Sequence, residues 1–302
     1  MLASLSIDLD ALEHYHRIHG LERRTNRDDP VYGKSVERFG ELCDRLGVRG
    51  TAFCVGVDLA RPGAAPALRR LALAGHELGN HSLSHDYALS RRSPPEIAAE
   101  VRGGAEAIRA VAGAAPVGFR APGYTLSREL LAALVEQGYR YDSSTFPTLP
   151  YWLGKAGVMG ALALGGRPSQ AILDRPRVLL APRRPYHPHP DEPYAHGPMP
   201  LLELPVATGL LGFPLTGTFV ATFPAWSLGL LRAGTGARPL FALELHGLDL
   251  LDASDASPAL AARQRDLRIP ASAKIERLVR FARALAGREW VTLAQAAERL
   301  SA

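Results

Sequence analysis

The sequence predicts an α/β protein with a parallel sheet, and two observations support this prediction. Short apolar segments typical of strands alternate with longer segments of helical periodicity over residues 4–141, and this alternation is typical of parallel strands joined by right-handed crossovers. Polar residues able to bind a metal or transfer a proton follow several of the predicted strands. Because the carboxyl ends of barrel strands carry the functional site, we expect those residues to lie together.

The composition excludes several classes of protein. The 302 residues are 47% apolar, which is enough for a full core in one large domain. The formal charge of +5 comes from basic residues interspersed with acidic ones, so we expect no nucleic-acid partner. An arginine-lined site for an anionic ligand is the alternative. The two cysteines, Cys43 and Cys54, are too few for a disulfide framework.

The N-terminal residues predict a cytoplasmic location. Residues 1–9 contain no basic region followed by a long apolar run, and residues with a predicted chemical role begin at Asp8. No run of about 18 apolar residues occurs, so we expect no transmembrane segment. A peripheral position at the inner face of the membrane is the alternative.

The first predicted strand, residues 4–9, brings two carboxylates to its end. Residues two apart in a strand point to the same side, so Asp8 and Asp10 should face one site. A metal ion held by one carboxylate, while the other takes protons, would relieve their repulsion. The alternative is an aspartate pair that opens a loop or caps a helix. The polar residues 13–32 are expected to form an irregular loop in which His14, His16 and His19 are solvated.

The central motif lies at residues 75–85, which read G-H-E-L-G-N-H-S-L-S-H. It follows a predicted helix at 35–46, a strand at 51–55 and a short helix at 68–74. Residues 76–79 read as a strand, so His81 and His85 lie just past its carboxyl end and can share one metal ion. Two histidines at this spacing are more often structural than metal ligands, so the pair alone does not establish a metal site.

The alternation continues to residue 142 and then fails. Ser93 and Glu96 form a predicted capping box for a helix that runs to about residue 111. The strand at 116–119 is followed by Arg120, the helix that begins after Ser127 runs to about residue 137, and the strand at 139–141 is followed by Asp142.

Residues 149–200 are expected to form an irregular insertion over the site, within one domain that spans residues 1–302. The first half of this segment is apolar and rich in glycine, and the second half is rich in proline. We expect the apolar half to pack on the barrel, with contact to a lipid-bearing substrate as the alternative. The sequence His187-Pro188-His189 favours a rigid extended loop over a second metal site.

The last predicted elements bring one more histidine to a strand end. Residues 201–204 read as a strand, and the apolar strand at 240–245 is followed by His246. A helix at 270–285, a strand at 290–293 and a final helix that ends at about residue 300 complete the chain.

Five short motifs resemble those of a known family. In order they read S-I-D-L-D, G-N-H-S-L-S-H, F-R-A-P-G-Y, Y-D-S-S and L-E-L-H, over residues 6–246. They resemble the motifs of the polysaccharide deacetylases, carbohydrate esterase family 4, which share the NodB-homology domain. The resemblance implies a distorted (β/α)7–8 barrel that binds one divalent metal ion, zinc first, with cobalt, nickel or manganese as alternatives.

The resemblance also implies a role for each site residue. Asp10, His81 and His85 would bind the metal, and Asp8 would be the general base. His246 would protonate the leaving amine, with Asp142 orienting its ring and Arg120 orienting Asp8. The groups expected to contact the acyl group and its oxyanion are Pro122, Tyr124, Glu244 and Leu245, and a backbone N–H near Tyr124 would polarise the acyl oxygen.

Two departures from the family pattern leave alternatives open. The usual adjacent Asp-Asp is here Asp8-Leu9-Asp10, so the base and the metal ligand could be exchanged. Glu244 occupies a position where the family commonly has a leucine that lines the acyl pocket. The acyl group is therefore open between acetyl and formyl.

The predicted function is metal-dependent removal of an N-acyl group, acetyl first, from an amino sugar. The substrate could be a small glycoside or could be linked to a nucleotide or a lipid. The alternatives are a deformylase or deacylase of a lipid-linked amino sugar, and a catalytically silent barrel that binds sugar or metal.

Overall fold

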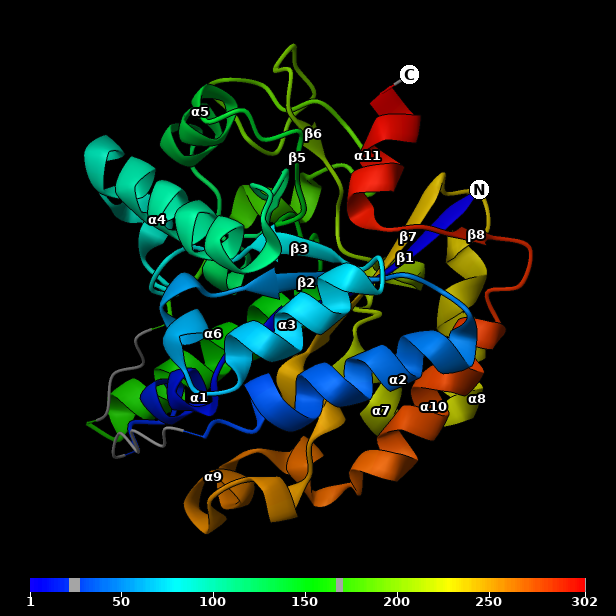
Figure 1. Ribbon diagram of the computed structural model, residues 1–302. Helices are drawn as coiled ribbons and strands as arrows, with labels where there is room; N and C mark the ends of the chain where they lie inside the picture. The colour runs from blue at the N-terminus through cyan, green and yellow to red at the C-terminus, as the bar shows by residue number, and fades with distance from the viewer. Residues whose placement is uncertain (22–27, 167–170, 302) are drawn as a thin grey trace.

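A parallel sheet curled into a distorted barrel forms the centre of the protein (Figure 1). The structure is a computed structural model that describes residues 1–21, 28–166 and 171–301. In the sheet the strands follow the order β6-β5-β4-β3-β2-β1-β7, and β8 pairs with the start of β1. The strands are β1 Leu2–Leu9, β2 Thr51–Cys54, β3 Glu77–Asn80, β4 Gly118–Phe119, β5 Tyr141–Asp142, β6 Leu202–Glu203, β7 Leu240–His246 and β8 Glu289–Trp290.

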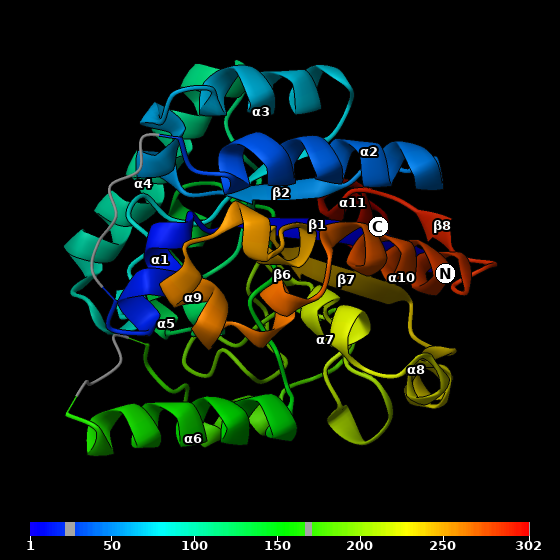
Figure 2. The ribbon, with the colours of Figure 1, turned by 90° about the horizontal axis from the view of Figure 1, so that it is seen from below.

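Helices cover the outside of the barrel. Figure 2 shows α2 and α3 on one side of the sheet and α6 on the opposite side. The helices are α1 Leu12–Ile18, α2 Val36–Leu46, α3 Ala64–Leu73, α4 Pro94–Ala112, α5 Arg128–Glu136, α6 Leu149–Leu164, α7 Gly217–Thr222, α8 Ala225–Arg232, α9 Pro258–Arg263, α10 Ala271–Arg283 and α11 Leu293–Ser301. None of the described helices is long and apolar enough to cross a membrane.

The central strand β1 shows how the sequence separates core from site. Its whole length is buried, yet polar and apolar residues alternate along it. Leu5, Ile7 and Leu9 belong to the main hydrophobic core, where they pack with residues of the outer helices. Ser6 and Asp8 point the other way, because both contact Arg120 inside the barrel. The alternation therefore directs Asp8 into the barrel interior.

The predicted barrel is confirmed, and its distortion lies between β6 and β7. These strands do not pair with each other within the described residues. The chain closes the gap just after β6, where the Ala207 N–H donates to the Ala242 carbonyl of β7 at 2.9 Å.

Two segments differ from the sequence-based expectation. The segment expected to be an irregular loop begins with α1, which buries His14 and His16, so the prediction that these histidines are solvated is wrong. His14 Nε2 lies 3.0 Å from Asp58 Oδ2, a buried carboxylate 44 residues away. Within that segment, residues 22–27 lie outside the described residues.

The segment predicted to be irregular, residues 149–200, begins with α6, an apolar helix of 16 residues. Thr148 caps α6 by accepting a hydrogen bond from the Tyr151 N–H, and Pro150 occupies the first turn. The prediction is therefore wrong for residues 149–164. The proline-rich half is extended, as expected, and His187 is held by the carbonyls of Met199 and Leu201. The domain boundaries stay a prediction.

The close packing of Gly118 against Tyr141 gives a test of the barrel. A Cβ at Gly118 would overlap the Tyr141 ring, which is fully buried and donates a hydrogen bond to Glu77 at 2.8 Å. We expect Gly118→Ala to lower the free energy of unfolding by about 1–3 kcal/mol through overpacking. Urea denaturation would measure it. As a control, Gly157→Ala in α6 adds a methyl group where the surroundings are open, and it should leave stability unchanged or raise it. Equal stability of the two variants would contradict the barrel packing.

Candidate metal and catalytic site

A cavity of about 380 Å³ opens at the carboxyl ends of the strands. Four of the predicted catalytic and metal-binding residues line it: Asp8, Asp10, His81 and His246. Its other described walls come from α1, from the loops that follow β3 and β4, from α6 and from Ala171; these residues are Tyr15, Ile18, Tyr87, Gly123, Tyr124, Tyr151, Gly154, Lys155, Val158, Met159 and Ala171. The strand ends thus bring together residues that lie more than 200 positions apart.

Asp10, His81 and His85 form the predicted metal cluster. Asp10 Oδ1 lies 3.2 Å from His81 Nε2 and 3.2 Å from His85 Nε2, and all three side chains are buried. Asp10 Oδ1 and both ring nitrogens of His85 lack a hydrogen-bond partner among the described residues. Because buried polar atoms rarely stay unpaired in folded proteins, these orphaned atoms indicate a place for a cation. Two imidazoles and one carboxylate are the donors that catalytic zinc sites use.

The protonation of the two histidines fits metal binding. His81 Nδ1–H donates to the Arg120 carbonyl at 2.7 Å, which leaves the Nε2 lone pair facing Asp10. Burial lowers the pKa of His85 to about 4, so its imidazole is neutral near pH 7. Burial also opposes the charged form of His81, but Asp8 and Asp10 raise its pKa above the usual value. A bound cation would replace that proton.

Backbone strain is concentrated around this cluster. Ser82, His85 and Tyr124 are not glycines, yet they have φ angles of 66°, 55° and 62°. The left-handed region disfavours residues with a Cβ and persists only where the surrounding structure enforces it. The Ser82 hydroxyl accepts a hydrogen bond from the His85 N–H at 3.0 Å, so it fixes the turn that aims His85 at Asp10.

A buried ion pair holds Asp8. Asp8 Oδ1 accepts a hydrogen bond from Arg120 Nη1 at 2.7 Å, and the Arg120 side chain has no exposure to solvent. Arg120 also donates to Ser6 and to two oxygens of Ser143, so its guanidinium is fixed in one orientation. The other oxygen of Asp8 lies 4.0 Å from His81 Nε2. This arrangement agrees with the proposed pairing of Arg120 with Asp8.

Glu244, and not Asp142, contacts the ring of His246. Glu244 Oε1 lies 2.8 Å from His246 Nδ1 and is fully buried. Burial lowers the pKa of His246, but Glu244 outweighs this effect and raises the pKa well above its usual value. The expected contact between Asp142 and His246 is not formed among the described residues. Glu244 and His246 lie two residues apart on β7. This spacing places both side chains on one face of the strand and could have revealed the pair.

Asp142 instead belongs to a buried pair of carboxyl groups. It lies opposite Glu203 in the β5–β6 register, and burial together with Asp142 raises the pKa of Glu203 well above its usual value. Asp142 accepts a hydrogen bond from the Ser144 hydroxyl at 2.7 Å, and that hydroxyl accepts one from the Ala121 N–H at 2.8 Å. Asp142 therefore supports the loop that carries Arg120 and Tyr124. Sequence reasoning missed Glu203, since its strand is short and carries no motif.

The residues expected to contact the acyl group are only partly in place. The Tyr124 side chain lines the cavity, and its hydroxyl lies 3.5 Å from His246 Nε2. The Tyr124 N–H donates to the Ala121 carbonyl at 3.0 Å, so this amide is already engaged. Pro122 is buried in the preceding turn, Leu245 packs in the main core, and neither is among the described residues that line the cavity. Glu244 serves His246 and is not an acyl-pocket wall.

Apart from Tyr124, sequence reasoning also missed the aromatic walls of the cavity, among them Tyr87 and Tyr151. The rings of Tyr87 and His85 meet edge to face at 4.7 Å, and Tyr124 lies 5.9 Å from the ring of Tyr151. Lys155 Nζ donates to the Gly123 carbonyl at 3.1 Å. Tyr151 and Lys155 come from α6, whose helical character was not predicted.

Comparison with known proteins supports the resemblance. The family model described as polysaccharide deacetylase matches residues 28–141. A search of curated proteins finds no significant match. Solved structures share the fold. A protein of Mycobacterium smegmatis assigned to the polysaccharide deacetylases has a TM-score of 0.62 at 19% identity, covering 99% of this chain and 90% of that chain.

Two further structures share the fold over nearly the whole chain. Puue allantoinase has a TM-score of 0.59 at 15% identity, covering 98% of this chain and 89% of that chain. A family 4 acetyl xylan esterase from Clostridium thermocellum, in complex with a cobalt ion, has a TM-score of 0.50 at 16% identity, covering 100% of this chain and 92% of that chain. The family model over residues 28–141 agrees with the resemblance that the motifs predict, and the solved structures show that the chain shares the barrel fold of these deacetylases.

Proposed function

We propose that this protein is a metal-dependent hydrolase that removes an N-acyl group, acetyl first, from an amino sugar. The observation that supports this most strongly is the convergence of Asp10, His81 and His85, with unpaired buried atoms, beside Asp8 and His246 in one cavity. A metal cluster with a carboxylate on one side and a charged imidazole on the other has the parts that amide hydrolysis requires.

Asp10, His81 and His85 would hold the metal ion. Three protein ligands leave a coordination position free, as catalytic zinc sites do. A divalent ion there would supply Lewis acidity, which polarises an acyl oxygen and lowers the pKa of water towards about 7. We propose zinc as the native ion, and the cobalt ion named for the Clostridium thermocellum esterase makes cobalt the first alternative.

Asp8 is suited to be the general base. Arg120 fixes its Oδ1, while Oδ2 remains directed toward His81 and the cavity. A carboxylate held in one orientation can accept a proton from the attacking water without reorganisation. The alternative is that Asp8 binds the metal and Asp10 is the base. Asp8 would then have to approach both histidines, but Asp10 lies closer to His81 than Asp8 does, at 3.2 Å against 4.0 Å.

His246 is suited to be the general acid. The Glu244 carboxylate at Nδ1 keeps the imidazole charged, so Nε2–H can donate a proton to the leaving nitrogen. Nε2 lies 3.9 Å from Asp10 Oδ2, which places the donor close to the metal ligands. The hydroxyl of Tyr124, 3.5 Å from Nε2, limits the directions from which a substrate can approach.

The cavity walls support a sugar as the substrate. Tyrosine rings suit the apolar faces of sugar rings, and their hydroxyls can pair with sugar hydroxyls. Since the allantoinase named above shares the fold, the fold alone does not select the substrate. A catalytically silent barrel is less well supported, because the residues to which we assign the base, the metal ligands and the acid are all present and lie close together. The cytoplasmic location stays a prediction.

Substitution of the two aspartates would separate the metal ligand from the base. We expect the wild-type protein to bind about one divalent ion per chain and Asp10→Asn to lose most of it, because Asp10 joins both histidines. Asp8→Asn should retain the metal and lose several powers of ten in kcat, as expected for a lost general base. Metal analysis and the release of primary amine from N-acetylated and N-formylated amino sugars would measure both effects. Metal loss in Asp8→Asn with retention in Asp10→Asn would reverse the assignment.

Glu244 and Asp142 form a matched pair for testing the acid. We expect Glu244→Gln to lower kcat by about 10²-fold while the metal content stays constant, because the His246 imidazole would lose the charge that keeps it protonated. Asp142→Asn should have less than about a tenfold effect, since Asp142 acts on the loop and not on His246. The release of primary amine at constant metal content would measure kcat for both variants. A larger loss of kcat in Asp142→Asn would contradict the role of Glu244.

A further inference from the structure

Helix α6 has its polarity reversed relative to an ordinary surface helix. Its one charged residue, Lys155, is turned toward the protein, where it donates to the Gly123 carbonyl. Trp152 is also held inward, by a hydrogen bond from its indole N–H to the Asp174 carbonyl at 3.0 Å. The exposed residues between the ends of the helix are all apolar or glycine: Leu149, Leu153, Gly154, Gly157, Val158, Gly160, Ala161, Ala163 and Leu164.

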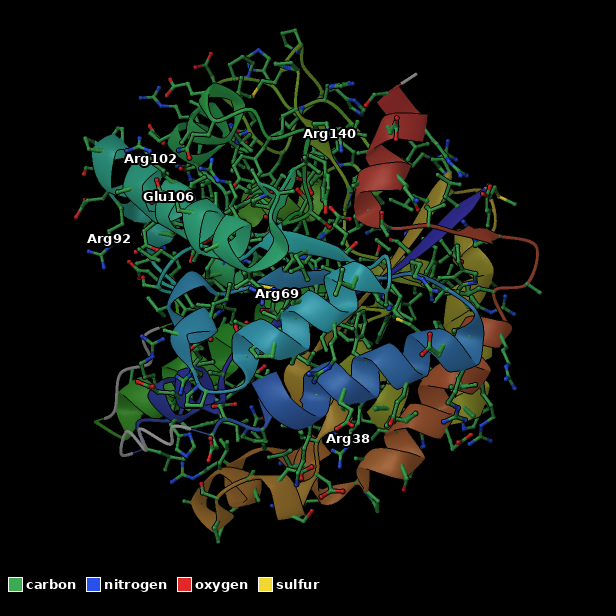
Figure 3. All side chains as sticks on the ribbon, in the orientation of Figure 1. Arg38, Arg69, Arg92, Arg102, Glu106 and Arg140 are labelled. Atoms are coloured by element: carbon green, nitrogen blue, oxygen red, sulfur yellow. The ribbon has the colours of Figure 1, made fainter. Side chains whose placement is uncertain are left out.

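The contrast with α4 shows that this is a local property. Both helices lie at the surface, but α4 carries charged side chains on its outer face, including Arg102 and Glu106 (Figure 3). A helix exposed to water normally presents such residues, since apolar side chains gain free energy from burial. The outer face of α6 therefore indicates an apolar environment that covers it.

The apolar surface continues beyond α6. Gly212 lies beside the start of this helix, because a Cβ placed on it would be 3.5 Å from the Pro147 carbonyl. In the same turn Leu211 is 80% exposed and adopts the left-handed conformation, with φ 54°. Next to this turn α8 presents Trp226, which is 77% exposed. Figure 2 shows α6 and α8 on the same side of the molecule.

Arginines border this apolar face. A cleft of about 650 Å³ is lined by Arg183, Arg184 and Arg238 together with the exposed Leu180. A Cβ at Gly212 would lie 2.7 Å from Arg183 Nη2, so the cleft adjoins the Leu211 turn. These arginines form no ion pair with a carboxylate among the described residues. Burial lowers the pKa of Arg238, and Arg183 and Arg184 lower it further, as expected for positive charge without a counterion.

We propose that the face formed by Leu149, Leu153, Leu164, Leu211 and Trp226 docks on an anionic lipid bilayer. An apolar helix face, an exposed tryptophan and flanking arginines without a carboxylate partner among the described residues are the features of interfacial binding. A protein partner would account for the apolar residues, but the uncompensated arginines at the edge complement the negative surface of such a bilayer. The inner side of α6 lines the cavity, so docking would hold the site beside lipid headgroups; this consequence, unlike the docking, rests on the proposed function.

Vesicle sedimentation of the full chain tests the docking. We expect the wild type to sediment with vesicles of phosphatidylglycerol and phosphatidylcholine, and to sediment less with phosphatidylcholine alone. The double variant Leu153→Glu and Leu164→Glu should bind the anionic vesicles at least tenfold more weakly, because two charges would enter the apolar interface. Arg183→Glu with Arg184→Glu should weaken binding and reduce its dependence on salt. Leu73→Glu is the matched control, since Leu73 is 83% exposed on α3, and it should bind like the wild type.

The outcomes separate docking from catalysis and from self-association. Asp10→Asn should still sediment with anionic vesicles, whereas Leu153→Glu with Leu164→Glu should still bind metal and hydrolyse a water-soluble amide substrate. Absence of wild-type binding, or equal losses in the Leu73→Glu control, would overturn the docking while leaving the hydrolase intact. A different outcome would assign the face to a second copy of the chain. In that case light scattering would show that the wild type is a dimer and the Leu153→Glu, Leu164→Glu variant a monomer, and the wild type would not bind vesicles.

Discussion

The buried ion pair between Asp8 and Arg120 is the constraint on which the site depends. Two charges removed from water cost several kcal/mol each unless they pair with each other and have their remaining hydrogen bonds satisfied. Here Arg120 meets Asp8, Ser6 and Ser143, and its guanidinium lies 4.3 Å from the centre of the Phe53 ring. Because its carbonyl also accepts the His81 Nδ1–H, one residue fixes both the proposed base and the tautomer of a proposed metal ligand.

The other buried charged groups near this pair also lie beside groups of opposite charge. Glu244 is matched by His246, just as Asp8 is matched by Arg120. Asp10 has two imidazoles nearby, and burial lowers the pKa of His85 so far that only one of these rings readily carries a proton. His85 has no hydrogen-bond partner for either nitrogen among the described residues. A cation bound between these three groups would complete both the charge balance and the hydrogen-bonding capacity of the site.

Much of the site could be predicted from the sequence, because parallel strands bring their carboxyl ends to one side. That rule placed Asp8, Asp10, His81 and His246 around one cavity without any knowledge of how the barrel closes. It could not identify which carboxylate reaches His246, although the position of Glu244 two residues before His246 on the same strand could have done so. The helix α6 was missed for a different reason: its glycines and its proline suggested an irregular segment, although the Thr148 cap and apolar residues suffice for a helix.

X-ray absorption of the zinc-loaded protein at the zinc edge tests the central claim most directly, because it reports the atoms bound to the ion without relying on turnover. We expect two imidazole ligands and a carboxylate oxygen, with the remaining coordination taken by oxygen from solvent. A zinc ion bound by no imidazole, by one imidazole or by sulfur would contradict the convergence of Asp10, His81 and His85 on a single metal.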